Sequence, residues 1–268
     1  MAEVLNEGSS SKVIPCYYMK AKPNFGDMLA PIIMKFISGR DLVYVGGNAE
    51  HKLLCIGTGM NRWLRKDDLV WGYGSRNVDV HGKIKVPEGV SFLAVRGQMT
   101  RESILADNPG VIVPEVYGDP GILMPLIYES KVKKEFELGL IPHYIDKVRF
   151  GKYSRKIKVI DVFDNPLRTI DNINRCELII STSMHGVIVA ESYGVPAVWL
   201  QVSDRILGGE FKFNDYFSGS GRGYTGPVCR MVGDITEKDL WKMRDFVLPK
   251  PTHDREALLK AWELPEGW

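Results

Sequence analysis

The sequence is poor in cysteine: four are spread over 268 residues, and no two of them form a CxxC pair. This spacing argues against a disulfide framework and against a structural zinc site. Cys16, Cys55 and Cys176 lie in or beside apolar runs, where buried free thiols in a reducing compartment are expected. No group of His, Asp and Glu has clear metal-ligand spacing, so we expect neither a metal nor a bound cofactor.

Long apolar runs are also lacking, because no window approaches the roughly 18 apolar residues of a membrane span. Residues 1–12, expected to form a disordered arm, lack the basic and then apolar order of a signal peptide. A net charge of +2 gives no general attraction to nucleic acid, so any anion site must be local. We expect a soluble cytoplasmic protein; peripheral attachment to the inner face of a membrane and homo-oligomerisation are left open.

Short apolar runs alternate with amphipathic stretches along most of the chain. A strand at 13–18 is followed by a helix at 28–38, whose apolar residues are spaced for one face. Further strands are expected at 53–56, 69–71, 92–95, 156–162, 177–181 and 197–202. With helical stretches between many of these runs, the pattern predicts an α/β protein with parallel sheets covered by helices.

A charged run at 129–135 interrupts this pattern and indicates a boundary between two domains. We place an N-terminal domain at 13–126 and a C-terminal domain at 138–232. The amphipathic tail at 235–268 is expected to be helical and to pack back on the first domain. Because open parallel sheets bind ligands beyond the carboxyl ends of their strands, two such domains facing each other would surround one cleft with loops.

The strongest local signal is the segment 177–196, in which a buried strand ends in three hydroxyl residues and a helix follows. Ser183 can cap this helix, and His185 falls in its first turn, where free amides and the helix dipole attract anions. His185 would bind a phosphate or carboxylate there, or transfer a proton. Alternatively, Ser183 is only a cap and His185 a satisfied structural residue. Glu191, in the last turn, opposes the helix dipole, which an ion pair or a substrate contact would offset.

Two other loops carry candidate side chains. Asp27, in the loop between the first strand and the first helix, is either an N-cap, a base, or an acceptor of a hydrogen bond from a sugar hydroxyl. Arg96 ends an apolar strand and either pairs with a carboxylate or reaches into the cleft. Its planar fork of donors suits a carboxylate or a phosphate.

Six short segments, in this order along the chain, resemble the sequence motifs of a known family. They are Asn24-Phe25-Gly26-Asp27, Gly72-Tyr73-Gly74-Ser75, Arg96-Gly97 with Thr100, Tyr117-Gly118-Asp119-Pro120-Gly121, Ser183-Met184-His185-Gly186 with Gly194-Val195-Pro196, and Lys212-Phe213-Asn214-Asp215-Tyr216. Together they resemble the polysaccharide pyruvyl transferase family over about residues 20 to 220. The segment 114–121 is most similar to that of the xanthan-type ketal pyruvyl transferases.

The resemblance implies two Rossmann-like domains facing across a cleft, as in the GT-B glycosyltransferases. The N-terminal domain would bind the acceptor and the C-terminal domain the donor. Phosphoenolpyruvate would be the co-substrate, and its pyruvyl group would pass to a sugar of an exopolysaccharide or of its lipid-linked precursor. The products would be a pyruvate ketal and phosphate.

The resemblance also assigns residues to roles. His185, Asp27 and Arg96 are the catalytic candidates. The donor-binding candidates are Arg96, Thr182, Ser183, His185, Lys212 and Glu191, and the acceptor-binding candidates are Asn24, Asp27, Gly59, Tyr73 and Asp119. Many family members carry Arg two residues before the histidine, where this chain has Ser183. Lys212 is our candidate for the missing charge, with Arg205 and Arg222 in reserve.

Two other interpretations stay open at this point. Glu191 and the segment 194–196 are also similar to the donor site of a GT-B nucleotide-sugar glycosyltransferase. The absent Arg at position 183 keeps open a third interpretation, a non-catalytic carbohydrate-binding protein descended from such an enzyme. Fold analogy alone does not decide among these functions.

Overall fold

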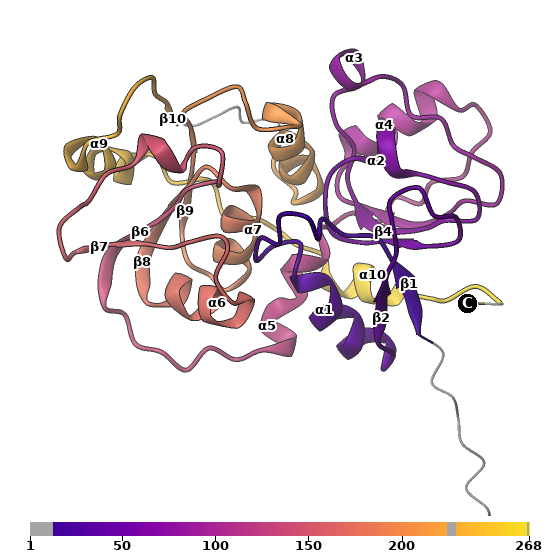
Figure 1. Ribbon diagram of the computed structural model, residues 1–268, viewed down its shortest axis with the longest axis horizontal. Coiled ribbons are helices and arrows are strands. Elements are labelled where there is room, and N and C mark those ends of the chain that lie inside the picture. Colours follow the sequence, from indigo (N-terminus) through magenta and orange to yellow (C-terminus); the bar gives the residue numbers. More distant parts are fainter. Residues whose placement is uncertain (1–12, 224–228, 267) are drawn as a thin grey trace, which may run out of the picture.

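The structure is a computed structural model, and it describes residues 13–223, 229–266 and 268. The expected disordered arm at 1–12 lies outside these residues. Two lobes stand side by side in Figure 1. We call residues 13–127 the first lobe and residues 136–246 the second lobe. Over the described residues, no helix is long and apolar enough to cross a membrane.

The first lobe contains a five-stranded parallel sheet in the order β2-β1-β3-β4-β5. Its strands are β1 (Ile14–Cys16), β2 (Leu42–Tyr44), β3 (Leu53–Leu54), β4 (Leu69–Tyr73) and β5 (Ser91–Val95). The helices are α1 (Leu29–Ser38), α2 (Met60–Trp63), α3 (Val78–His81), α4 (Gln98–Asp107), α5 (Met124–Ile127) and the 3₁₀ helix η1 (Pro120–Leu123). Four of these strands lie at or near the expected positions, although β1 and β3 are shorter than the apolar runs that predict them. The edge strand β2 was not predicted.

Helix α1 forms where the apolar spacing predicts it. Leu29, Ile33 and Met34 are buried on one face, which packs into the core of the first lobe. Pro31 falls in the first turn, where its missing N–H breaks no helical hydrogen bond. Gly39 ends the helix with φ +69°, a left-handed conformation that glycine adopts without strain.

The second lobe contains a second five-stranded parallel sheet, in the order β10-β9-β8-β6-β7. Its strands are β6 (Phe136–Ile141), β7 (Ile157–Val159), β8 (Cys176–Ser181), β9 (Ala197–Gln201) and β10 (Cys229–Arg230). Its helices are η2 (Lys147–Arg149), α6 (Pro166–Asn174), α7 (Met184–Ser192), α8 (Gly209–Gly219), α9 (Glu237–Lys242) and η3 (Met243–Phe246). The expected α/β class with parallel sheets is therefore confirmed.

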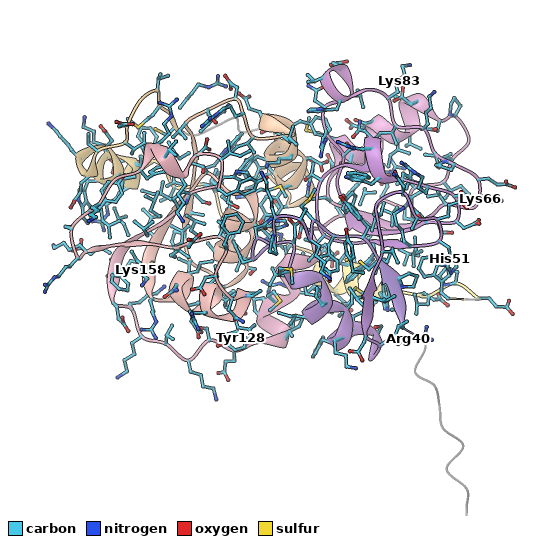
Figure 2. The ribbon with its side chains drawn as sticks, viewed as in Figure 1. Arg40, His51, Lys66, Lys83, Tyr128 and Lys158 are labelled. Carbon is cyan, nitrogen blue, oxygen red and sulfur yellow. The ribbon has the colours of Figure 1, made fainter. Side chains whose placement is uncertain are left out.

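The charged stretch 128–135 contains neither helix nor strand and links α5 to β6. Charged side chains also cover the outside of both lobes, where the labelled Lys66, Lys83 and Lys158 extend away from the protein (Figure 2). Lys66 and Lys83 are exposed, which keeps their charges in contact with water.

The C-terminal segment returns to the first lobe through α10 (Arg255–Lys260). The indole Nε1 of Trp71, a fully buried residue of β4, donates to the carbonyl of Leu258 at 3.0 Å. The Trp71 and Trp262 rings meet edge to face with centroids 5.1 Å apart. In Figure 1, α10 lies between α1 and the first sheet's strands, far in sequence from both.

A buried ion pair joins the two lobes. Arg96, directly after β5, donates from Nε to Asp215 Oδ2 on α8 at 2.9 Å, and both side chains are fully buried. The Thr100 amide and hydroxyl donate to the same carboxylate, each at 2.7 Å. Gly97 allows this close approach, since a Cβ at that position would lie 1.7 Å from the Asp215 carbonyl oxygen. The carboxylate is thus fully hydrogen-bonded, which a buried charge requires.

We expect Asp215→Ala to lower the free energy of unfolding by about 3–5 kcal/mol, because it leaves the Arg96 charge buried without its partner. Urea denaturation measures the change. The exposed pair Lys35–Asp41, at 3.0 Å, supplies the control. Asp41→Ala should cost less than about 1 kcal/mol. An equally small loss for Asp215→Ala would show that the buried pair does not hold the lobes together.

Candidate active site

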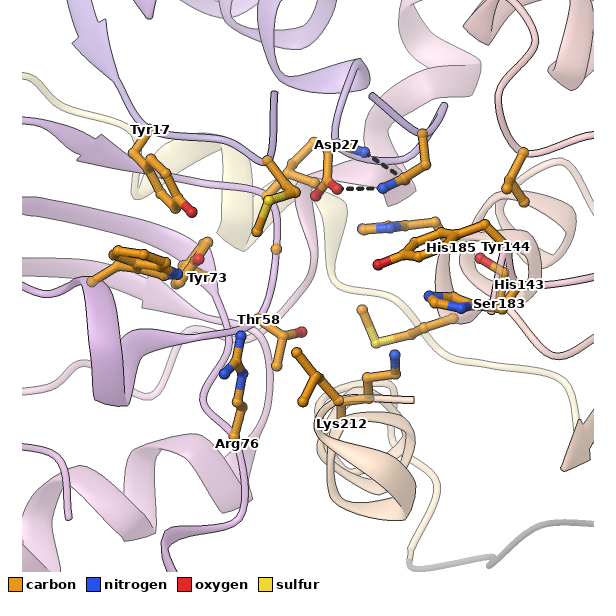
Figure 3. A pocket seen from close by; sticks show the side chains of 18 residues that line it. Tyr17, Asp27, Thr58, Tyr73, Arg76, His143, Tyr144, Ser183, His185 and Lys212 are labelled. Carbon is orange, nitrogen blue, oxygen red and sulfur yellow. Dashed lines mark hydrogen bonds between the residues drawn. The ribbon is translucent and has the colours of Figure 1, made fainter. Parts of the chain in front are cut away.

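A cavity of about 120 Å³ opens between the lobes, at the carboxyl ends of strands from both sheets (Figure 3). Tyr17, Gly57 and Tyr73 reach it from the ends of β1, β3 and β4, and His143 and Ser183 from the loops after β6 and β8. This is where open parallel sheets bind ligands. Pockets for drug-sized ligands measure roughly 300–1,000 Å³, so this cavity suits a small molecule or one part of a larger one.

Six of the predicted site residues line this cavity. They are Asn24, Asp27, Tyr73, Ser183, His185 and Lys212. The first three come from the first lobe and the last three from the second. Residues predicted to bind the acceptor therefore lie beside residues predicted to bind the donor. The structure thereby brings together the two loops that the sequence marked most strongly.

Asp27 is held by the side chain of Asn24. Asn24 Nδ2 donates to Asp27 Oδ2 at 2.5 Å, and the Asp27 amide donates to Asn24 Oδ1 at 3.2 Å. The interpretation of Asp27 as the N-cap of α1 is wrong, because Met28 occupies that position and makes no side-chain cap. Burial raises the pKa of Asp27, while the nearby His185 and the Asn24 hydrogen bond act in the opposite direction. A carboxyl group tuned in this way suits proton transfer.

His185 is the second residue of α7, and its ring packs on Gly26. A Cβ at Gly26 would lie 2.2 Å from His185 Nδ1, so only glycine leaves room for the ring. Figure 3 shows the ring beside Asp27 and Tyr144, at the wall of the cavity. The position of the His185 ring thus requires glycine at position 26.

Ser183 and Thr182 have different environments. Ser183 occupies the N-cap position of α7, but its hydroxyl makes no cap hydrogen bond. Its backbone amide donates to Ser181 Oγ at 3.0 Å. The Ser183 side chain lines the cavity and is left for a ligand. Thr182 is buried, and its hydroxyl accepts from the His143 amide at 2.7 Å, which fixes the backbone after β6.

Two buried cations face the cavity without a carboxylate partner. Lys212, on α8, is 7% exposed, and Arg76, directly after β4, is 8% exposed. Within the described part of the chain, neither has an acidic group within ion-pair distance, and Arg76 Nε is buried without a hydrogen bond. Buried charges are ordinarily paired, so these two side chains point to an anionic ligand.

The pKa of Lys212 is lowered to about 7, first by burial and then by the charge of Arg96, with Arg76 adding to the effect and Asp27 opposing it. Burial also lowers the pKa of His143 to about 3, and the charge of Lys212 adds to this shift. His143 is therefore neutral near neutral pH. An arriving anion would favour the charged form of Lys212.

Several predicted site residues lie outside the lining of this cavity. Arg96 is buried in its pair with Asp215 and also donates to Thr58 Oγ1 at 2.6 Å. Asp119 is fully buried behind His185. Gly59 begins α2, with Trp63 packed against it. Their assignments as ligand-binding residues stay predictions.

Glu191 also lies away from the cavity. Its carboxylate pairs with Arg222, the closest contact being 2.6 Å, and accepts from the Tyr216 hydroxyl at 2.7 Å. Arg222 is therefore the ion-pair partner that offsets the unfavourable placement of Glu191 at the helix end. Arg205, the other reserve cation, is exposed and donates to the Ile145 carbonyl at 3.0 Å. Neither reserve cation lines the cavity.

Sequence reasoning missed Arg76, Tyr17 and Tyr144. Arg76 directly follows the Gly72-Tyr73-Gly74-Ser75 turn, so its place at the carboxyl end of a parallel strand was a usable signal. Tyr17 and Tyr144 stand on opposite lobes and give the cavity aromatic walls. No spacing rule marks them, because each sits in an irregular loop after a strand.

The sequence profile described as "Polysaccharide pyruvyl transferase" matches residues 41–204, more than half of the chain. The chain belongs to the polysaccharide pyruvyl transferase family. The family resemblance inferred from the sequence is thereby confirmed, and the match includes the Gly72–Ser75 turn, Asp119 and the start of α7.

Two curated proteins are similar to this chain. The uncharacterized protein L143 of Acanthamoeba polyphaga mimivirus is 31% identical over 155 residues, 54% of this chain and 52% of that protein. The succinoglycan biosynthesis protein ExoV of Rhizobium meliloti (strain 1021) is 28% identical over 217 residues, 75% of this chain and 63% of that protein. The chain thus spans between half and two thirds of the length of these relatives.

A solved structure of an uncharacterised protein from Klebsiella pneumoniae subsp. pneumoniae NTUH-K2044 is also similar, at 14% identity and a TM-score of 0.47. The alignment covers 82% of this chain and 92% of that one. The score is too low to establish a common fold.

Lys212→Met tests the buried charge. The pKa of Lys212 is about 7 in the folded protein and 10.5 for a free lysine, so between these values the unfolded chain holds more protons and stability rises with pH. We expect the stability gained by Lys212→Met over the natural protein to be largest below pH 7. It should shrink toward pH 10 by at most about 1.4 kcal/mol per pH unit.

Lys212→Arg is the matched control, because arginine stays charged in both states across this range. The difference in unfolding free energy between Lys212→Arg and Lys212→Met should therefore not change with pH. If the natural protein behaves in the same way, Lys212 does not carry a buried and unpaired charge.

Proposed function

We propose that this protein transfers the pyruvyl group of phosphoenolpyruvate to a sugar of an exopolysaccharide or of its lipid-linked precursor. The single observation that carries the proposal is a pair of buried cations, Arg76 and Lys212, in the cavity beside the start of α7. Neither has a carboxylate partner among the residues that the structure describes. Phosphoenolpyruvate carries a carboxylate and a phosphate, so it supplies the two negative charges that this arrangement needs. The family membership limits the reaction to pyruvyl transfer onto polysaccharide.

The donor would lie between the cations and the start of α7. Arg76 would hold one anionic group through its planar fork, and Lys212 the other as a point charge. The Ser183 hydroxyl and the free amides at the first turn of α7 would complete the phosphate site. Lys212 replaces the arginine that many family members carry at position 183, which explains how this chain keeps its donor charge.

His185 is the proposed general acid. It gives a proton to the methylene carbon of the donor, the electron pair of the C=C bond forms the new C–H bond, and the central carbon becomes electrophilic. Asp27 takes the proton of an acceptor hydroxyl as its oxygen attacks that carbon. Arg96, through its pair with Asp215, keeps the two lobes in register around this chemistry.

The second half of the reaction closes the ring. The C–O bond to phosphate breaks and its electron pair leaves with the phosphate. A second hydroxyl of the same sugar attacks the central carbon, and its proton is carried away with the phosphate. Two C–O bonds to the sugar form and one C–O bond to phosphate breaks, which gives a pyruvate ketal and inorganic phosphate.

The acceptor would enter from the first lobe. Asn24, Asp27 and Tyr73 line that side of the cavity, and Tyr17 gives an aromatic wall for a sugar ring. We further propose that the two lobes form a GT-B-like arrangement, with acceptor bound by the first lobe and donor by the second. The reaction would take place in the cytoplasm, at the inner face of the membrane for a lipid-linked acceptor.

Donor binding gives the first test. Phosphoenolpyruvate should raise the thermal unfolding midpoint and a nucleoside diphosphate should not, because a ligand stabilises the state that binds it. Arg76→Met and Lys212→Met should each weaken phosphoenolpyruvate binding by about tenfold or more, the loss expected for a charge-assisted contact of 1.5–3 kcal/mol. Lys83→Met removes the same charge from an exposed lysine and should leave binding unchanged.

Turnover gives the second part of the same test. With a lipid-linked or aryl oligosaccharide as acceptor, phosphate release and the mass gain of a pyruvyl ketal should appear together. His185→Ala should abolish both while phosphoenolpyruvate binding persists. Stabilisation by a nucleoside diphosphate alone would favour a nucleotide-sugar glycosyltransferase instead, and full activity of His185→Ala would remove this residue from the mechanism.

A further inference from the structure

His185 and Asp119 have complementary polar atoms that the rest of the described protein leaves unsatisfied. His185 Nε2 and Asp119 Oδ2 are both buried without a hydrogen bond, and they lie 3.5 Å from each other. Such orphaned polar atoms are rare in folded proteins and call for an explanation. The two atoms explain each other, because Nε2 can donate a hydrogen bond and Oδ2 can accept it.

The two side chains belong to different lobes. Asp119 follows the first sheet and begins η1, where its Oδ1 accepts from the Gly121 amide at 2.9 Å. His185 lies in the first turn of α7, and its ring is fixed against Gly26. Asp119 Oδ1 therefore stabilises the η1 turn, and Oδ2 faces the imidazole of the other lobe.

The burial of Nε2 indicates which nitrogen would meet a ligand. His185 lines the cavity, and its Nε2 is shielded inside the protein, which leaves Nδ1, next to Gly26, as the nitrogen for the substrate. A hydrogen bond at one ring nitrogen decides which tautomer the ring adopts and how it is oriented. Contacts of this kind are often long in the absence of substrate and shorten when it binds.

Asp27 is the other carboxylate that faces His185, and it cannot take this role. Its side chain is bonded to Asn24 and lines the cavity, on the side that the acceptor would occupy. His143, after β6, and Lys212, on α8, also face the histidine across the cavity, and neither offers a carboxylate. Of the carboxylates in the described residues, Asp119 alone combines full burial with an unbonded oxygen 3.5 Å from Nε2.

We propose that Asp119 is a positioning residue that accepts a hydrogen bond from His185 Nε2, so that Nδ1 delivers the proton to the donor. This inference rests on the proposed function for its catalytic part. Asp119 neither gives nor takes a proton. His185 gives the proton from Nδ1 to the methylene carbon and regains the one that Asp27 takes from the attacking hydroxyl. Because the pair spans both lobes, the acid is oriented only when the lobes are docked.

Asp119→Asn tests the proposal, since the amide oxygen can still accept from Gly121 while the charge at Oδ2 is lost. We expect kcat to fall by about a hundredfold or more, within the range that a positioned acid contributes. The Kd for phosphoenolpyruvate should change little.

A nitrogen-15 NMR spectrum of the histidine rings gives a readout that needs no turnover. In the natural protein, the neutral His185 ring should carry its proton on Nε2, and in Asp119→Asn this preference should be lost. The signal is assigned by its absence in His185→Ala. If both proteins show the same tautomer, the proposal is overturned even where activity falls.

Asp68→Asn is the matched control, because Asp68 is another buried carboxylate of the first lobe, paired with Lys52 at 2.6 Å and outside the cavity. It should lower stability and leave the His185 tautomer unchanged. If Asp119→Asn does not fold, Asp119→Ser keeps an oxygen for η1 and is tested in its place. An inactive natural protein would refute the proposed function, whereas an active one with an unchanged kcat in Asp119→Asn would refute only this inference.

Discussion

The ion pair between Arg96 and Asp215 is the contact on which the geometry of the site depends. It fixes α8 of the second lobe against the loop after β5 of the first, with Thr100 completing the coordination of the carboxylate. Lys212 lies one turn before Asp215 on the same helix, so the pair also sets where the lysine charge stands. A small shift of α8 would move that charge away from Arg76 and the start of α7.

Much of the fold could be predicted from the sequence because its strands are short apolar runs that end at glycine-rich loops. Runs such as 69–71 and 177–181 became β4 and β8, since buried parallel strands need apolar residues on both faces. The limits of β1 and β3 could not be predicted, because pairing with neighbouring strands, and not composition, decides where a ladder ends. Whether Asp27 caps α1 could not be decided either, since the sequence does not show that Asn24 donates to the Asp27 carboxylate.

The site was partly predictable for a related reason. Residues such as Asp27 and His185 stand at the carboxyl ends of strands, where topology alone brings loops together. The role of Arg96 depended on a partner 119 positions away, and a sequence does not show which carboxylate will face it. Arg76 was overlooked because a sequence does not show that its side chain is buried. Its Nε has no hydrogen-bond partner among the described residues, which only the packed structure reveals.

The return of the C-terminal segment to the first lobe has a consequence for how the chain acquires its structure. Trp71 bonds to Leu258 and packs on Trp262, so a central strand of the first sheet relies on residues that the ribosome makes almost two hundred positions later. During synthesis, that surface stays open while the second lobe emerges. The first core is therefore completed only after Leu258 and Trp262 have been made, which makes the lobes interdependent in folding even though each has its own sheet.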